Sequence, residues 1–246
     1  MKRNVMVVVG VLLGLTAARG VVQAQAPAAP TVDQIIEKYV TAVGGRAAME
    51  KVTSRVSTGT VEIADMGMSG TITVSEKAPN KSLAVFEIAG AASGREGTDG
   101  TVAWSDSPQT GMVEKTGAEA ADALRGGTFN SELKLKTLYK TVVTAGKELV
   151  NGREAFVIVA TPAEGAAVRM YFDAVSGLLV KSSSTRDSPA GPLDIDVMMD
   201  DYRDVGGVKQ PFTIRQVTQM FTLVVHMTEI KLNVPLDDAI FKKPGL

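Results

Sequence analysis

The stretch from Lys147 to Asp187 constrains the fold most strongly, because turn signals in it alternate with β-forming segments. Asn151-Gly152 lies between two apolar runs, and this dipeptide favours the positive backbone φ angles of a type I′ turn. The next turn signals follow at 162–165 and 173–177, with Val, Ile, Phe, Tyr and Thr between them. A turn about every ten to twelve residues predicts a meander of antiparallel strands.

Apolar and polar residues alternate over most of the remaining chain, as they do in half-buried strands. In segment 193–202, apolar residues at odd positions alternate with mostly acidic residues at even positions, which predicts one buried and one wet face. Segment 89–98 is rich in Gly, Ala and Ser and is expected to be a loop, whereas 129–139 fits a short helix at least as well as a strand. The other expected elements are strands over 53–64, 68–77, 83–88, 101–105, 193–202, 207–219 and 220–232, and helical turns over 46–51, 116–124 and 235–241.

A helix is predicted ahead of the first strand. Thr31 and Gln34 have the spacing of a capping box, which places the start of the helix near Val32. Gly44-Gly45 marks its end. The apolar residues of this helix recur at helical spacing and predict one buried stripe: Val32, Ile35, Ile36, Tyr39, Val40 and Val43.

The first 26 residues have the three parts of a secretory signal peptide. Lys2 and Arg3 precede an apolar run over 5–15, and small residues end at Ala24-Gln25-Ala26. The run is too short to span roughly 30 Å of hydrocarbon. We expect cleavage near Ala26 and a periplasmic protein; the alternatives are cleavage after Val22-Gln23-Ala24 or retention as an anchor. A Pro/Ala linker over 27–30 and one domain over 31–246 follow.

Charge and cysteine content exclude several classes of protein. Cleavage removes Lys2, Arg3 and Arg19 from 26 basic residues and none of 27 acidic residues, which leaves 23 against 27 and a net charge of −4. Nucleic acid is therefore not an expected partner, because binding it needs a basic patch. The chain has no cysteine, which excludes disulfides and a lipid-modified N-terminal Cys.

No stretch of the sequence has a catalytic or metal-binding pattern. His226 is the only histidine, and in mid-strand it is interpreted as an exposed strand residue. The acidic residues over 194–204 lack the spacing of a calcium loop. The glycines over 94–97 match no dinucleotide or phosphate-binding motif, and the hydroxyl residues over 182–185 lack a partnered base. We therefore expect no enzyme, no cofactor and no metal.

Methionine content motivates a binding hypothesis. Two of the 11 methionines lie in the signal peptide, and several of the others fall on expected strands. Met is flexible and polarizable, and it suits a surface that accepts varied apolar groups. Segment 155–160 is apolar on both faces, as a strand between covering helices and a ligand would be. The alternative, which composition favours, is an ordinary packed core.

The order of these elements resembles the outer-membrane lipoprotein-sorting protein family and its relatives, the LolA-like periplasmic carriers. The similar features are the first helix, the NGR-led hairpin, the Asp-closed strand with its Ser-Gly turn, the Gly-Val-Lys-x-Pro-Phe strand start and the Asn-x-Pro-Leu-Asp closing turn. The stretches that carry them are TVDQIIEKYVTAVGG, DGTVAWSDS, VNGREAFVIVATP, VRMYFDAVSGLLVKSS, DYRDVGGVKQPFTIR and KLNVPLDDAIFKKP.

This resemblance implies a mainly β fold, namely a single unclosed barrel of about ten or eleven antiparallel strands around an apolar cavity, with N-terminal and lid helices. It implies a non-enzymatic periplasmic carrier of a lipoprotein acyl chain, a lipid or another apolar ligand. We expect a monomer that is not an integral membrane protein after cleavage. The alternative is an envelope assembly module that docks a protein partner and carries no small ligand.

Alternation along the strands, and not the resemblance, selects candidate residues for an apolar cavity. Each of them is also compatible with a filled core. The candidates are Ile72, Val74, Phe86, Trp104, Phe156, Ile158, Phe172, Ile195, Val197, Phe212, Ile214, Phe221 and Leu223.

Overall fold

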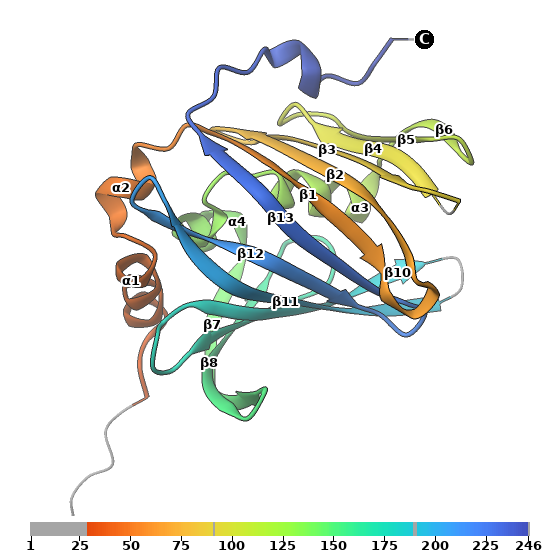
Figure 1. Ribbon diagram of the computed structural model, residues 1–246. Helices are drawn as coiled ribbons and strands as arrows, with labels where there is room; N and C mark the ends of the chain where they lie inside the picture. The colour runs from red at the N-terminus through yellow and green to blue at the C-terminus, as the bar shows by residue number, and fades with distance from the viewer. Residues whose placement is uncertain (1–28, 91, 189–190, 246) are drawn as a thin grey trace, which may run out of the picture.

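The computed structural model describes residues 29–90, 92–188 and 191–245, so the expected signal peptide lies outside the described residues (Figure 1). Thirteen antiparallel strands form one sheet in the order β6-β5-β4-β3-β2-β1-β13-β12-β11-β10-β9-β8-β7. Strands pair with their neighbours in sequence, except that β1 pairs with β13, and β6 and β7 are the two ends of the sheet. A twisted sheet of this width curls, and it forms the unclosed barrel predicted from the sequence, with thirteen strands in place of about ten or eleven.

The strands and helices have the following bounds. The strands are β1 Ser54–Ile63, β2 Met68–Lys77, β3 Lys81–Ile88, β4 Ala92–Thr98, β5 Ala103–Ser107, β6 Gly111–Glu114, β7 Thr141–Val150, β8 Arg153–Thr161, β9 Val168–Asp173, β10 Leu179–Ser188, β11 Gly191–Val205, β12 Val208–Val217 and β13 Thr222–Leu232. The helices are α1 Val32–Ala42, α2 Arg46–Glu50, α3 Gly117–Gly126 and α4 Leu135–Leu138, with 3₁₀ turns η1 Ala64–Met66, η2 Ser131–Lys134 and η3 Asp238–Phe241.

Local signals in the sequence place the turns and the first helix correctly. Asn151 and Gly152 have φ angles of 51° and 78°, as the type I′ turn requires. The capping box between Thr31 and Gln34 is present at the start of α1. The predicted stripe of α1 is buried except for the half-buried Val32, and it packs with residues of α4, β8 and β9. Tyr39 meets Phe172 edge-on at a centroid distance of 5.6 Å.

The prediction of a loop over 89–98 is wrong, because residues 92–98 form β4, which pairs with both β3 and β5. Two glycines in this strand lie beneath aromatic rings. A Cβ on Gly94 would lie 3.1 Å from Cζ of Phe86, and one on Gly97 would lie 2.9 Å from Cζ2 of Trp104. The glycines therefore make room for rings on neighbouring strands and do not mark a loop. Strand β6 was not predicted, and segment 129–139 is helical over η2 and α4.

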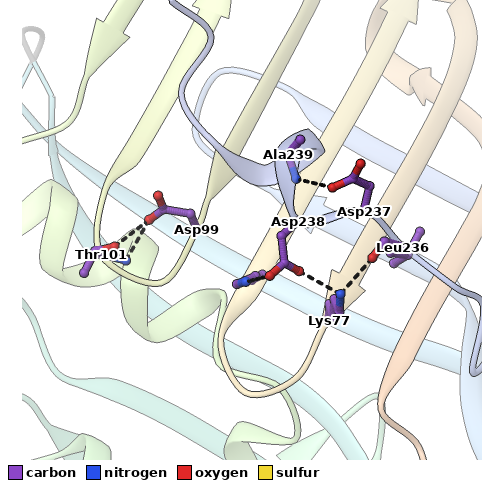
Figure 2. A network of polar contacts seen from close by, with 8 residues as sticks. Lys77, Asp99, Thr101, Leu236, Asp237, Asp238 and Ala239 are labelled. Carbon is purple, nitrogen blue, oxygen red and sulfur yellow. Dashed lines mark hydrogen bonds and ion pairs between the residues drawn. The ribbon is translucent and has the colours of Figure 1, made fainter.

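The closing turn, η3, is fastened to the outer face of the sheet. Figure 2 shows Lys77 donating to the carbonyl of Leu236 and to the carboxylate of Asp238, at 2.7 Å in both cases. Lys81 pairs with the other oxygen of Asp238. The indole Nε1 of Trp104 donates to the carbonyl of Phe241 at 2.9 Å, and the Phe241 ring is fully buried. The chain after β13 thus contacts β2, β3 and β5, and it also contacts β1 through Val234 and β6 through Lys243.

Acidification is expected to loosen this closing segment. Hydrogen bonds from Lys77 and Lys81 lower the pKa of Asp238 from 3.8 to about 2. Because the folded pKa is below the unfolded one, the contribution of Asp238 is complete above pH 3.8 and is lost as the pH falls toward 2. Amide hydrogen exchange over 238–241 should therefore lose protection in that range. Asp238→Asn is the control, and the same pH profile in both proteins would contradict the prediction.

Candidate functional site

A cavity of about 740 Å³ lies between α3 and the inner face of the sheet. One wall is a row of directly opposed residues on three strands: Val74 on β2, Ala84 on β3 and Glu96 on β4. Such residues share a face of the sheet. The opposite wall comes from segment 165–168 and β10. Figure 1 shows α3 and α4 on the side of the sheet toward which its strands curve. The volume is within the range of about 300–1,000 Å³ typical of small-molecule sites.

Small residues account for the empty space. Ala and Gly dominate the part of the wall formed by α3 and the loop before β9. At Gly127, which follows α3, a Cβ would lie 2.5 Å from Cγ2 of Thr98, so the close approach of the helix end to β4 requires glycine. The small aliphatic and glycine residues of the lining are Val74, Ala84, Gly97, Ala118, Ala123, Gly126, Gly127, Gly165, Ala166 and Val168.

Helix α3 covers the cavity but is weakly attached to the sheet. None of its residues is buried. Ion pairs connect the helix and the segment before it to the sheet: Lys115, just ahead of α3, lies 3.1 Å from Glu96, and Asp122 within α3 lies 2.8 Å from Arg186 on β10. Partly exposed ion pairs of this kind contribute about 0–1 kcal/mol each. A helix held in this way opens at a small free-energy cost compared with the strands beneath it.

Polar side chains lie at the inner end of the cavity. Arg55 on β1 makes two hydrogen bonds to Glu76, at 2.6 and 2.8 Å, and a third to Gln210 on β12. Its guanidinium also lies 5.7 Å from the centroid of the Phe129 ring. Glu76 belongs to the cavity wall. A half-buried Arg–Glu pair with this many hydrogen bonds fixes the geometry of this end of the barrel and adds little net stability.

Burial and neighbouring charges shift the pKa values of this region. For Arg55, desolvation works against the charged form, but the charge and hydrogen bond of Glu76 together with Glu132 and Tyr39 outweigh it, so the pKa is raised. Burial raises the pKa of Glu132 on η2, and Arg55 only partly offsets this. Burial likewise raises the pKa values of Tyr39, Tyr139 and Tyr202. The three phenols therefore stay neutral at physiological pH.

The sequence-selected cavity candidates are divided among several places. Val74 and Trp104 line the cavity, although the Trp104 indole is tied to η3. Phe156, Ile158 and Phe172 pack with α1. Contact with a ligand stays a prediction for all of them. Of the others, Ile72, Phe212, Ile214 and Leu223 form a second apolar cluster, Ile195 is buried, and Phe86, Val197 and Phe221 are half-buried.

Sequence reasoning missed most of the cavity wall. The missed residues include the small ones on α3 and over 165–166 and the charged residues Asp122, Arg125 and Arg186. The enrichment of Ala and Gly near α3 was the available signal. However, apolar alternation selects large side chains, and this cavity exists where side chains are small.

The other sequence candidates do not form a site. His226 is exposed, and its Nδ1 lies 3.3 Å from the hydroxyl of Thr213. Ser183 and Thr185 donate to Asp196 and Asp194, respectively, in cross-strand pairs. Within residues 29–90, 92–188 and 191–245, no group of three or more His, Cys, Asp or Glu side chains is arranged to hold a metal ion.

A second hollow, of about 640 Å³, lies on the other face of the sheet and is more open to solvent than the cavity under α3. Its charged groups already have partners. Lys181 lies 2.8 Å from Asp196, Arg169 pairs with Glu148, and Arg169 and Lys181 flank the Tyr171 ring at 5.8 and 5.3 Å. The candidate site is therefore the cavity under α3.

Comparison with known proteins identifies the fold. No family model and no curated protein matches the sequence. A LolA superfamily protein from Nitrosomonas europaea is 17% identical over 87% of this chain and 99% of its own, with a TM-score of 0.58. A DUF1329 family protein from Desulfovibrio piger is 13% identical over 86% of this chain and 97% of its own, with a TM-score of 0.57.

A third solved structure is similar to this chain to about the same extent. A domain assigned as an outer membrane lipoprotein-sorting protein, from Vibrio parahaemolyticus, is 12% identical over 86% of this chain and 97% of its own, with a TM-score of 0.58. At these identities the likeness concerns the fold. The resemblance found in the sequence is confirmed at that level, and the chain has a LolA-like fold.

Proposed function

We propose that this chain, with its LolA-like fold, is a non-catalytic periplasmic carrier or binding protein for an acyl chain, a lipid or another apolar ligand. The observation that carries the proposal is the cavity of about 740 Å³ between α3 and the inner face of the sheet. The named structural relatives include a lipoprotein-sorting domain, and the sequence predicts export.

The physical basis is the transfer of an apolar chain out of water. Each buried CH₂ contributes about 0.8 kcal/mol, so a few methylenes beside Val74, Ala84 and Val168 provide useful affinity. Release requires only that α3 move, since the ion pairs of Lys115 with Glu96 and of Asp122 with Arg186 are partly exposed. A weakly held cover over a rigid sheet suits a protein that must both take up and give up its cargo.

The proposed location is the periplasm, after cleavage near Ala26. Among the described residues, no helix combines the length and the apolar character needed to cross a membrane. We propose that the mature protein is a monomer that carries its ligand between binding partners or membranes.

Native mass spectrometry with lipid extraction tests the proposal. The mature protein, purified from a periplasm without detergent, should carry a co-purifying acyl lipid or acylated peptide and should have the mass of one chain plus that ligand. The extract identifies the class of cargo. A mass of the bare protein that persists after incubation with phospholipids and acylated peptides would sink the carrier proposal.

The alternative role, docking of an envelope protein, is favoured by the edge strand β7. This strand ends the sheet, and its Val143 and Leu149 side chains are 54% and 71% exposed. An exposed edge can accept a further strand from a partner. A bare protein that captures an envelope protein, and loses it when Val143 and Leu149 are replaced by Lys, would support this role instead.

A further inference from the structure

Arg125, the penultimate residue of α3, is a cation in the cavity wall with unused hydrogen-bonding capacity. Its side chain is 13% exposed. The Nε atom is buried and has no hydrogen-bond partner within the described part of the chain. One terminal nitrogen makes a long contact of 3.5 Å to Asp122, and the guanidinium lies 6.0 Å from the centroid of the Tyr139 ring. Buried donors are nearly always satisfied in native proteins, so this one requires an explanation.

The charges around Arg125 do not balance. Asp122 is shared between Arg125, at 3.5 Å, and Arg186, at 2.8 Å. Two guanidinium groups and one carboxylate leave one positive charge at this end of α3. At the other end, Lys115 lies between Glu96 and Glu119, at 3.1 and 3.4 Å, which leaves one negative charge. The cavity is thus electrically polarised along α3.

There is also room for a ligand group beside Arg125. Gly126, Gly127, Gly165 and Ala166 surround it in the wall. A Cβ on Gly165 would lie 3.3 Å from a terminal nitrogen of Arg125, so glycine at this position keeps the approach to the guanidinium open. A guanidinium with free donors matches the geometry of a carboxylate or phosphate oxygen pair.

We propose that the cavity takes a singly anionic amphiphile, whose carboxylate or phosphate is bound by Arg125 while its apolar chain lies along Val74, Ala84 and Val168. This inference rests on the proposed function and specifies its ligand class. The anion neutralises the excess charge of the Arg125–Asp122–Arg186 group and supplies acceptors to the terminal nitrogens of the Arg125 guanidinium. Asp122 then positions Arg186 at the rim of the cavity and does not compete for the ligand.

Displacement of a neutral fluorophore, Nile red, from the mature protein tests the inference. The competitors are hexadecanol, hexadecanoate and the phosphate diester hexadecyl methyl phosphate, which have the same chain and head groups that are neutral or singly anionic. The wild-type protein should bind the better of the two anions about tenfold or more tightly than the alcohol, as expected for hydrogen bonds to a charged group. The order of the two anions tells whether the natural head group is a carboxylate or a phosphate.

Variants at Arg125 separate this inference from the proposed function. Arg125→Met keeps the apolar stem and should lose the preference for the anion while its affinity for hexadecanol is unchanged. Arg125→Lys, which keeps the charge, should retain part of the preference. Arg215→Met, an exposed change on β12, is the matched control and should behave as wild type.

Each outcome has one meaning. Equal binding of alcohol and anions by the wild type, or an anion preference that survives in Arg125→Met, would overturn the role of Arg125 and leave the carrier function standing. Failure of all three competitors and of Nile red to bind would overturn the carrier function itself. Folding of each variant is checked by its far-ultraviolet circular dichroism and melting temperature.

Discussion

Phe241→Ala is expected to lower the free energy of unfolding by about 3–5 kcal/mol, the range for removing a buried aromatic ring. Phe241 lies beyond the last strand, yet its side chain has no exposed surface. The carbonyl oxygen of Phe241 accepts a hydrogen bond from the Trp104 indole Nε1 at an N···O distance of 2.9 Å. Displacement of η3 would therefore also leave a buried donor without a partner. The loss is a large part of the roughly 5–15 kcal/mol that stabilises a typical domain.

Urea denaturation, followed by tryptophan fluorescence, measures this effect directly because Trp104 is the only tryptophan. Ile240→Ala is the matched control. Ile240 is the preceding residue of the same 3₁₀ turn, but it is 39% exposed, and its truncation should change the unfolding free energy by less than about 1 kcal/mol. Similar losses in the two variants would show that η3 contributes as a whole turn and not through the buried ring.

The sequence predicts those elements of this fold that are determined by local chemistry. The capping box of Thr31 and Gln34 fixes the start of α1, and Asn151-Gly152 fixes a hairpin, because each depends on backbone geometry within a few residues. A helical turn was likewise predicted over 235–241, and residues 238–241 form the 3₁₀ turn η3. Which of its side chains is buried, Phe241 and not Ile240, depends on the contact with the sheet.

Elements that depend on distant partners were not predictable in the same way. The sequence of β4 suggests a loop because Gly94 and Gly97 are poor strand formers. Glycine is needed at these positions because the Phe86 and Trp104 rings on neighbouring strands occupy the space of a Cβ atom. The candidate site also depends on contacts between segments that are far apart in sequence. Its wall joins α3 to segment 165–168 and β10, which are far apart in sequence, and no periodicity within one element reveals that Arg125 and Arg186 share Asp122.

Ala84→Trp is expected to abolish ligand uptake while the protein remains folded. Ala84 is a half-buried residue of β3 in the cavity wall, directly opposite Val74. An indole group there occupies space that the proposed acyl chain needs. Displacement of as few as two methylenes weakens binding by about tenfold or more, at roughly 0.8 kcal/mol for each CH₂. Native mass spectrometry should show the bare protein where wild type carries lipid.

Val85→Trp is the control for this experiment, because it puts the same ring on the same strand but on the other face. Successive residues of a strand point to opposite sides, and Val85 is 44% exposed. It should bind ligand as wild type does, and both variants should melt within a few degrees of wild type, since Trp is well accommodated in strands. If Ala84→Trp still carries lipid at the wild-type level, the cargo does not lie under α3. Equal loss in both variants would instead assign the effect to the strand and not to the cavity.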